Sequence, residues 1–179
     1  PAIYFADPLI DGYPRVYDGT PSRFPDISEG VRTREDAFAE VDRLAAAGVH
    51  LIKTYEMLKP DVFQALLERA AMHKLPVTSH VPLSMQADAV AASGGGGIEH
   101  VRNIGLSCSK EADLLQGERT SMLEHGSNEE GSTLRAAIHA SQRPRAFSSQ
   151  DPGRCAMVIT ALANNRVFQT PTLALNTRG

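Results

Sequence analysis

The sequence lacks the features that would direct the chain to a membrane or to nucleic acid. No run approaches the roughly 18 apolar residues that a membrane-spanning helix needs, and no basic segment followed by an apolar one suggests a signal peptide. The 18 Lys and Arg residues are scattered, and the net charge is -3. Because nucleic acids and anionic membranes attract clustered positive charge, we expect neither as a partner.

Cysteine is also scarce. The two cysteines, Cys108 and Cys155, do not have the C-x-x-C spacing of a metal site. Two interpretations stay open: two buried free thiols, or one disulfide formed in an oxidising compartment. A disulfide would indicate a periplasmic or secreted protein, and free thiols a cytoplasmic one.

The composition is that of one folded domain. The chain has 179 residues, of which 42% are hydrophobic and 22% charged, as is usual for a soluble globular protein. No internal repeat occurs, and the SGGGG stretch at 93–97 is the one low-complexity segment. We therefore expect a single domain over 1–179 with a hydrophobic core.

Helix and strand signals alternate along the first hundred residues. A helix is expected over 33–48, between the cap residue Thr33 and Gly48, and a second helix begins near Pro60. Apolar segments rich in β-formers predict strands at 49–55, 76–81 and 97–101, with a helix over 84–95 before the last of them. This order predicts an α/β fold with a parallel sheet, either an open doubly wound sheet or a (β/α) barrel.

Two regions flank this pattern. A short strand is expected at 2–6, followed by a Pro- and Gly-rich loop over 7–26. After residue 103 we expect further helices and then a final strand within 166–175, which makes five strands in all. The segment 104–152 is long for a loop between strand and helix, and we interpret it as an insertion and a candidate lid.

Three polar residues stand at the ends of successive predicted strands: Lys53, His80 and His100. In a parallel sheet or barrel the carboxyl ends of the strands meet at one edge, so these side chains should converge. Two neutral imidazoles there are suitable ligands for a divalent metal such as zinc. A lysine in an apolar strand is costly as an ammonium, because burial disfavours its charged form.

Each of these residues also has a structural explanation when taken alone. A histidine at a strand end is commonly a hydrogen-bonded loop residue, and a strand lysine can extend its ammonium to the surface. Their occurrence on three successive strands favours a functional site.

The sequence resembles the amidohydrolase superfamily, in particular its imidazolonepropionase-like and prolidase-like metal-dependent hydrolases. The matching segments are AAGVHLIKTYEMLKPDVFQALLERAAMHKLPVTSHVPLSM, GIEHVRN and TPTL, which cover most of 33–103 and part of 167–173. The resemblance implies an eight-stranded (β/α) barrel with one or two divalent metals, often zinc. It also implies hydrolysis of amide or other C–N bonds in a small-molecule or peptide-like substrate, by metal-activated water.

By the same resemblance, Lys53 would be the catalytic lysine that takes up carbon dioxide and binds metal as a carbamate. His80 and His100 would be metal ligands. We expect Tyr55, Arg102 and Asn103 to contact substrate. Packing at the barrel mouth explains Tyr55 equally well, and a solvated loop is the slightly favoured alternative for Arg102 and Asn103. Glu99 is expected to face away from the site. The remaining histidines are assigned no role; they are His50, His73, His125 and His139.

The sequence also departs from the family pattern. No two histidines are two residues apart, so the H-x-H pair of the first barrel strand is missing, and Asp151 does not fit the aspartate of the last strand. We therefore expect an incomplete barrel covering about strands three to seven, as a segment of a longer protein or one completed by another chain. Its exposed sheet edges would favour a homo-oligomer or other association.

Two alternatives to the hydrolase stay open. The chain could be a catalytically silent barrel fragment that needs missing strands or a partner chain. It could also be a Schiff-base aldolase, because LIKTY resembles the strand in which deoxyribose-phosphate aldolase carries its reactive lysine, here Lys53.

Overall fold

The protein forms a parallel sheet of six strands, seen in a computed structural model that describes residues 4–21, 24–101 and 103–173. Every pairing between neighbouring strands is parallel. The order across the sheet is β2-β1-β3-β4-β5-β6. The strands are β1 Leu9–Asp11, β2 Ser28–Gly30, β3 Ile52–Thr54, β4 Val77–Ser79, β5 Gly97–Glu99 and β6 Phe168–Thr170. The α/β prediction is confirmed, with six strands instead of the expected five.

The beginning of the sheet differs from the prediction. Residues 4–6 are not a strand, and 1–3 lie outside the described residues. The first strand is β1, inside the expected loop at 7–26, and its Ile10 carbonyl accepts a 2.8 Å hydrogen bond from the Tyr55 amide. β2 then lies outside β1, at the edge of the sheet. Three-residue strands between prolines and glycines give little periodic signal, which explains the error.

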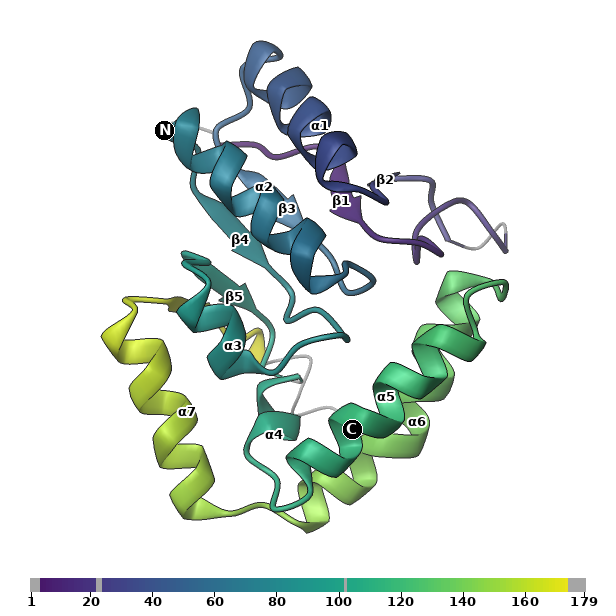
Figure 1. Ribbon diagram of the computed structural model, residues 1–179, viewed down its shortest axis with the longest axis vertical. Coiled ribbons are helices and arrows are strands. Elements are labelled where there is room, and N and C mark those ends of the chain that lie inside the picture. Colours follow the sequence, from purple (N-terminus) through teal and green to yellow (C-terminus); the bar gives the residue numbers. More distant parts are fainter. Residues whose placement is uncertain (1–3, 22–23, 102, 174–179) are drawn as a thin grey trace.

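The predicted helices beside the sheet are confirmed. They are α1 Arg34–Ala46, α2 Pro60–Met72, α3 Ala87–Ala92 and α7 Pro152–Asn164, and Figure 1 shows α1 and α2 side by side in front of the sheet. Thr33 caps α1 in a reciprocal pair with Asp36, each amide donating to the other side chain at 3.1 Å. Gly48, just after this helix, has a φ of 80°, which glycine adopts without strain.

The main core lies between these helices and the sheet. Three strand isoleucines are completely buried in it, namely Ile10, Ile52 and Ile98. Helix residues pack against them, among them Val41, Leu44, Val62, Phe63, Leu66 and Val90. Burial of this apolar surface at roughly 25 cal/mol per Å² is what holds the helices onto the sheet.

The segment 104–152, which we interpreted as an insertion, forms three helices: α4 Ile104–Ser107, α5 Ala112–His125 and α6 Gly131–Ser148. Helices α5 and α6 lie together as a hairpin, apart from the helices that cover the sheet (Figure 1). Leu134 and Ile138 of α6 belong to a second buried cluster with Tyr55, Met57 and Leu83. Because these partners follow β3 and β4, the hairpin packs against the carboxyl ends of the strands.

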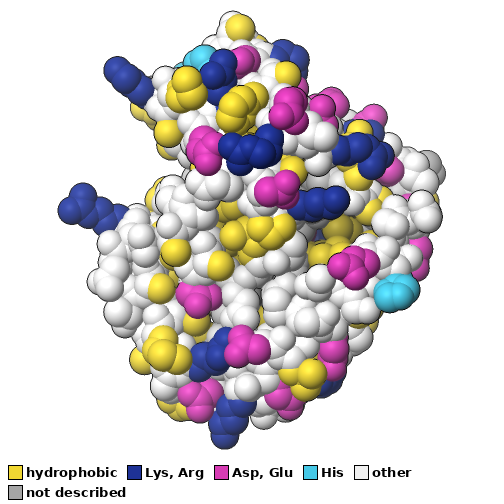
Figure 2. Space-filling model, in the orientation of Figure 1, with side chains coloured by type: hydrophobic (Ala, Val, Ile, Leu, Met, Phe, Trp, Pro, Cys, Tyr) yellow, Lys and Arg dark blue, Asp and Glu magenta, His cyan; other side chains and the backbone are white. Residues whose placement is uncertain are grey.

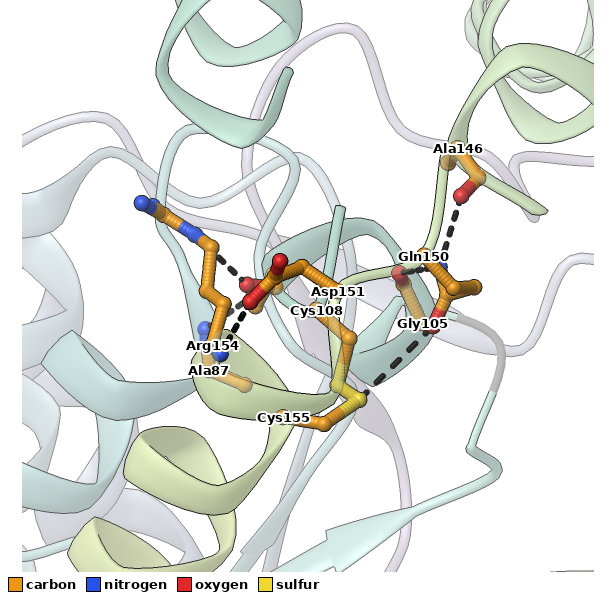
Figure 3. The surroundings of a disulfide bond; sticks show 9 residues. Ala87, Gly105, Cys108, Ala146, Gln150, Asp151, Arg154 and Cys155 are labelled. Carbon is orange, nitrogen blue, oxygen red and sulfur yellow. Dashed lines mark hydrogen bonds between the residues drawn. A yellow bond between two sulfur atoms is a disulfide. The ribbon is translucent and has the colours of Figure 1, made fainter. Parts of the chain in front are cut away.

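A disulfide joins Cys108 and Cys155, whose Cα atoms are 4.4 Å apart (Figure 3). It links the end of α4 to the first turn of α7 and so closes the base of the insertion. The Asp151 amide donates to the Cys108 carbonyl at 2.9 Å, and the Gln150 side-chain amide donates to the Gly105 carbonyl at 2.7 Å. Of the two interpretations left open above, the structure has the disulfide.

The described residues contain no helix that is both long and apolar enough to span a membrane. On the face shown in Figure 2, basic and acidic side chains are intermixed, without a large area of one sign. This distribution agrees with the scattered charge of the sequence.

Candidate metal centre

The three predicted site residues lie on three adjacent strands in space. Lys53 is the middle residue of β3, and His80 and His100 directly follow β4 and β5. The His80 amide donates to the Thr54 carbonyl at 3.1 Å, and the His100 amide donates to the Thr170 carbonyl at 2.9 Å. These bonds extend the strand pairing by one residue and bring the two imidazoles to the same edge of the sheet.

His80, Glu99 and His100 form a group that could hold a metal ion. One ligand atom from each residue lies within 4.8 Å of the others. The two imidazole rings are nearly perpendicular, with centroids 4.7 Å apart. Two nitrogen donors and one carboxylate oxygen at this spacing are a donor set that zinc and similar divalent ions accept.

The two histidines are held in place through their Nδ1 atoms. Nδ1 of His80 is 2.9 Å from Oε1 of Glu56, and the His80 ring packs on Tyr55 with centroids 4.3 Å apart. Nδ1 of His100 contacts the Thr172 hydroxyl. His100 has a φ of 64°, in the left-handed region that costs a non-glycine residue about 1 kcal/mol, a local strain often found at functional sites. With Nδ1 of His80 engaged by Glu56, Nε2 is the atom of that ring to which a metal would bind.

Glu99 faces the site, so the prediction that it faces away was wrong. The cause is the register of the strands: Lys53 of β3 lies opposite Thr78 of β4, and Thr78 lies opposite Gly97 of β5. Residues two apart on a strand share a face, so Glu99 lies on the same face as Lys53. Oε2 of Glu99 forms an ion pair with Nζ of Lys53, and Oε1 accepts a 3.1 Å hydrogen bond from the Thr78 hydroxyl.

The electrostatics of the site follow from this pairing. Burial lowers the pKa of Lys53, and the neighbouring Glu99 carboxylate partly opposes that change. Burial alone would raise the pKa of Glu99, but the Lys53 ammonium holds it below its usual value. For His80, burial lowers the pKa against the opposing effect of Glu56, so its ring favours the neutral form that binds metals.

A buried carboxylate, Glu56, lies behind His80 and was missed by the sequence reasoning. Its Oε2 is 2.7 Å from Nε2 of His139, and Arg135 donates to both of its oxygens, at 3.0 and 2.9 Å. Burial would raise its pKa, but hydrogen bonds from His139 and His80 and the charge of Arg135 hold that pKa well below its usual range. An acidic residue within the apolar run after Lys53 was the one available signal. Nothing local indicated its partners on α6.

The expected substrate-binding residues have different surroundings. Tyr55 is buried at the end of β3, and burial raises the pKa of its hydroxyl, which lies 3.5 Å from that of Tyr17. Asn103 is also buried, and its side-chain amide donates to the Val81 carbonyl at 3.1 Å. A hydrogen bond of this kind is typical of a side chain with a structural role, here joining the segment after β5 to the segment after β4. Arg102 lies outside the described residues.

Comparison with solved structures gives the same architecture. An ochratoxinase from A. niger matches 96% of this chain and 46% of its own, with a TM-score of 0.51 and 13% identity. The chain has the fold of an incomplete (β/α) barrel. The incomplete barrel agrees with the predicted fold class.

Two further structures are similar to this incomplete barrel. A prolidase solved with N-methylphosphonate-L-proline has a TM-score of 0.49 and 16% identity over 90% of this chain and 45% of its own. A bottromycin amidohydrolase has a TM-score of 0.41 and 16% identity over 88% of this chain and 50% of its own. The chain thus spans about half the length of these proteins. No family model and no curated protein matches the sequence.

Proposed function

We propose that the chain is part of a metal-dependent hydrolase that cleaves amide or other C–N bonds in a small-molecule or peptide-like substrate. The observation that supports this function is the group of His80, Glu99 and His100 at the carboxyl edge of the sheet, with ligand atoms within 4.8 Å of one another. That edge is where (β/α) barrels carry their catalytic residues.

The donor set fits one divalent ion. Nδ1 of His80 is engaged by Glu56, so Nε2 of that ring would be its metal-binding atom, while His100 adds a second imidazole nitrogen and Glu99 an anionic oxygen. A zinc ion bound by these residues would acidify a water molecule and polarise a substrate carbonyl. A second ion would need further ligands, of which Lys53 could supply one.

Lys53 is proposed to act as a carbamate. Reaction of the neutral amine with carbon dioxide forms an N–C bond, releases a proton and turns the side chain into an anionic oxygen ligand. Burial favours this reaction, because it lowers the pKa of Lys53 and so raises the share of neutral amine. The Glu99 ion pair opposes it and would have to open. Carbon-13 NMR with labelled bicarbonate detects the carbamate directly.

Substrate contacts are proposed for Tyr55, Arg102 and Asn103, which follow β3 and β5. For Asn103, the carbonyl oxygen is the atom to consider, since it is buried and forms no hydrogen bond within the part of the chain that the structure describes. Tyr55 packs directly on His80 and would form one wall of the site.

Metal analysis tests the proposal, because binding does not require the parts of a complete barrel. We expect about one or two equivalents of zinc per chain, lost in His80→Ala. His125→Ala is the matched control, since His125 is exposed on α5 and should leave the metal content unchanged. Metal-free wild-type protein, or equal metal in both variants, would support the catalytically silent fragment.

The Schiff-base alternative is kept because Lys53 is largely buried with a lowered pKa, as a nucleophilic lysine requires. Borohydride reduction in the presence of a carbonyl substrate separates the two chemistries. A stable adduct on Lys53 would favour the aldolase, and its absence together with bound zinc would favour the hydrolase.

Two further proposals concern the setting of the protein. The Cys108–Cys155 disulfide suits an oxidising compartment, so we propose a periplasmic or secreted protein. Among the residues that the structure describes, the edge strands β2 and β6 each have one neighbouring strand, and Phe168 on β6 is 60% exposed. We therefore propose association through these edges, as a homo-oligomer or with the rest of a barrel.

A further inference from the structure

We propose that Glu56 is a positioning residue of the metal centre, and that the insertion hairpin takes part in the centre by holding Glu56 in place. The carboxylate fixes the ring orientation and the tautomer of His80. His139 and Arg135 of α6 in turn fix the carboxylate. This inference rests on the function proposed above and adds residues that the metal-binding group itself does not include.

The carboxylate of Glu56 has a full set of hydrogen-bond partners. Its side chain is 2% exposed, and each oxygen has two partners. Oε1 is 2.9 Å from both His80 Nδ1 and Arg135 Nη2. Oε2 is 2.7 Å from His139 Nε2 and 3.0 Å from Arg135 Nε. A carboxylate has about four lone-pair positions, so this arrangement uses all of them.

The chemistry of these contacts assigns the protons. An ionised carboxylate only accepts hydrogen bonds, so Nδ1 of His80 must carry the hydrogen. The Nε2 lone pair of His80 is then the one that can bind metal. A carboxylate that accepts from the second nitrogen of a metal-binding histidine fixes the ring and makes it a stronger ligand.

The charges of the cluster balance. Glu56 contributes one negative charge and Arg135 one positive charge, so His80 and His139 can both stay neutral. A neutral His80 is the form that a metal requires.

The hairpin brings its two residues from far away in the sequence. Arg135 lies 79 residues and His139 83 residues beyond Glu56. They are one turn apart on α6, and the intervening Ile138 is completely buried against the strand ends. Apolar packing therefore anchors α6. From this fixed position, Arg135 and His139 reach Glu56.

Zinc affinity separates positioning from a merely structural role. We expect Glu56→Gln to weaken zinc binding by about 10- to 100-fold in competition with a chromophoric chelator, because glutamine accepts at one atom only. Glu40→Gln is the matched control: Glu40 is also buried and accepts two hydrogen bonds from Arg43 on α1, at 2.8 and 2.6 Å. Unchanged affinity in folded Glu56→Gln, with a loss of stability alone, would overturn the proposal.

A second pair of variants tests the part played by the hairpin. Arg135→Gln should weaken zinc binding on the order of tenfold, because Glu56 loses two of its donors. Arg145→Gln removes an arginine from the same helix whose partners, Glu111 and Glu118, lie away from the site. Equal zinc affinity in these two variants would show that the hairpin does not take part in the metal centre.

The tautomer of His80 can be measured in the wild-type protein without metal, which avoids variants that fail to fold. Nitrogen-15 NMR should show hydrogen on Nδ1 and none on Nε2. The opposite tautomer would overturn the positioning role. Wild-type protein that binds no zinc but has hydrogen on Nδ1 would instead refute the proposed metal function, while Glu56 would still orient His80.

Discussion

Lys53 and Glu99 form an ion pair across the sheet, with Thr78 of the intervening strand donating a 3.1 Å hydrogen bond to the same carboxylate. The lysine side chain is 13% exposed and that of Glu99 25%. The site thus pairs the lysine that the family resemblance assigns as a metal ligand with a carboxylate that was expected to face away from it.

This pair should contribute measurably to the stability of the metal-free protein. Lys53→Met leaves Glu99 partly buried without its counter-charge, and we expect a loss of about 1 to 3 kcal/mol in the free energy of urea unfolding near neutral pH. Arg34→Met is the control, because its pair with Glu68 is more than 40% exposed on both sides and should contribute at most about 1 kcal/mol. Equal effects of the two substitutions would contradict the prediction.

Asp11 should make stability depend on pH. Burial raises the pKa of its carboxyl from 3.8 to about 7, against the lowering effect of hydrogen bonds from the amides of Val16, Met57 and Gly12. The folded state therefore keeps a proton that the unfolded chain releases above about pH 4. Stability should fall by up to about 1.4 kcal/mol per pH unit as the pH rises from about 4 to about 7, and level off above that.

Urea unfolding across this pH range checks the assignment to Asp11. Asp11→Asn should be less stable than the wild type, since it loses one of two acceptor oxygens, but its stability should vary less between about pH 4 and about pH 7. A variant with the same pH slope as the wild type would show that other groups cause the dependence.

Removing the disulfide should destabilise the fold. The bond closes a loop between residues 47 apart, for which the loss of chain entropy in the unfolded state corresponds to about 4 kcal/mol. We expect a loss of this order in the double variant Cys108→Ser and Cys155→Ser. Added reductant should lower the stability of the wild type and leave the double variant unaffected. Two titratable thiols in denatured, unreduced wild-type protein would contradict the disulfide itself.

The packing of the insertion hairpin can be tested with two isoleucines. Ile138 on α6 is completely buried against the strand ends, and Ile138→Ala should cost about 2 to 5 kcal/mol. Ile159 on α7 is 61% exposed, so Ile159→Ala should change stability by less than about 1 kcal/mol. Thermal and urea unfolding of both variants measure the difference. A near-neutral Ile138→Ala would mean that the hairpin does not pack on the strand ends in solution.

Two glycines should respond oppositely to alanine. A Cβ at Gly12 would collide with the backbone of Met57, so Gly12→Ala should cost at least about 1 to 3 kcal/mol. Gly117 lies within α5, where an added methyl group would meet open space, and Gly117→Ala should stabilise by about 0.5 to 1 kcal/mol. Unfolding midpoints that move in the same direction for both would contradict the close approach at Gly12.

Most of the helices and the central strands could be predicted from the sequence, because their signals are local. The Thr33 cap, Gly48 and Pro60 mark the ends of α1 and the start of α2 through contacts within a few residues. The placement of Lys53, His80 and His100 on three adjacent strands followed from the alternation of strand and helix. The short strands β1 and β2 escaped prediction because they have too few residues for a periodic pattern.

The sequence by itself thus determined the alternating α/β pattern and the edge of the sheet near which Lys53, His80 and His100 lie. Only the tertiary structure decided which side chains meet there. Glu99 faces Lys53 because of strand register, and His139 and Arg135 reach Glu56 because α6 packs on the strand ends. Register and packing depend on contacts between residues far apart in the chain, and no local pattern of residues encodes such distances.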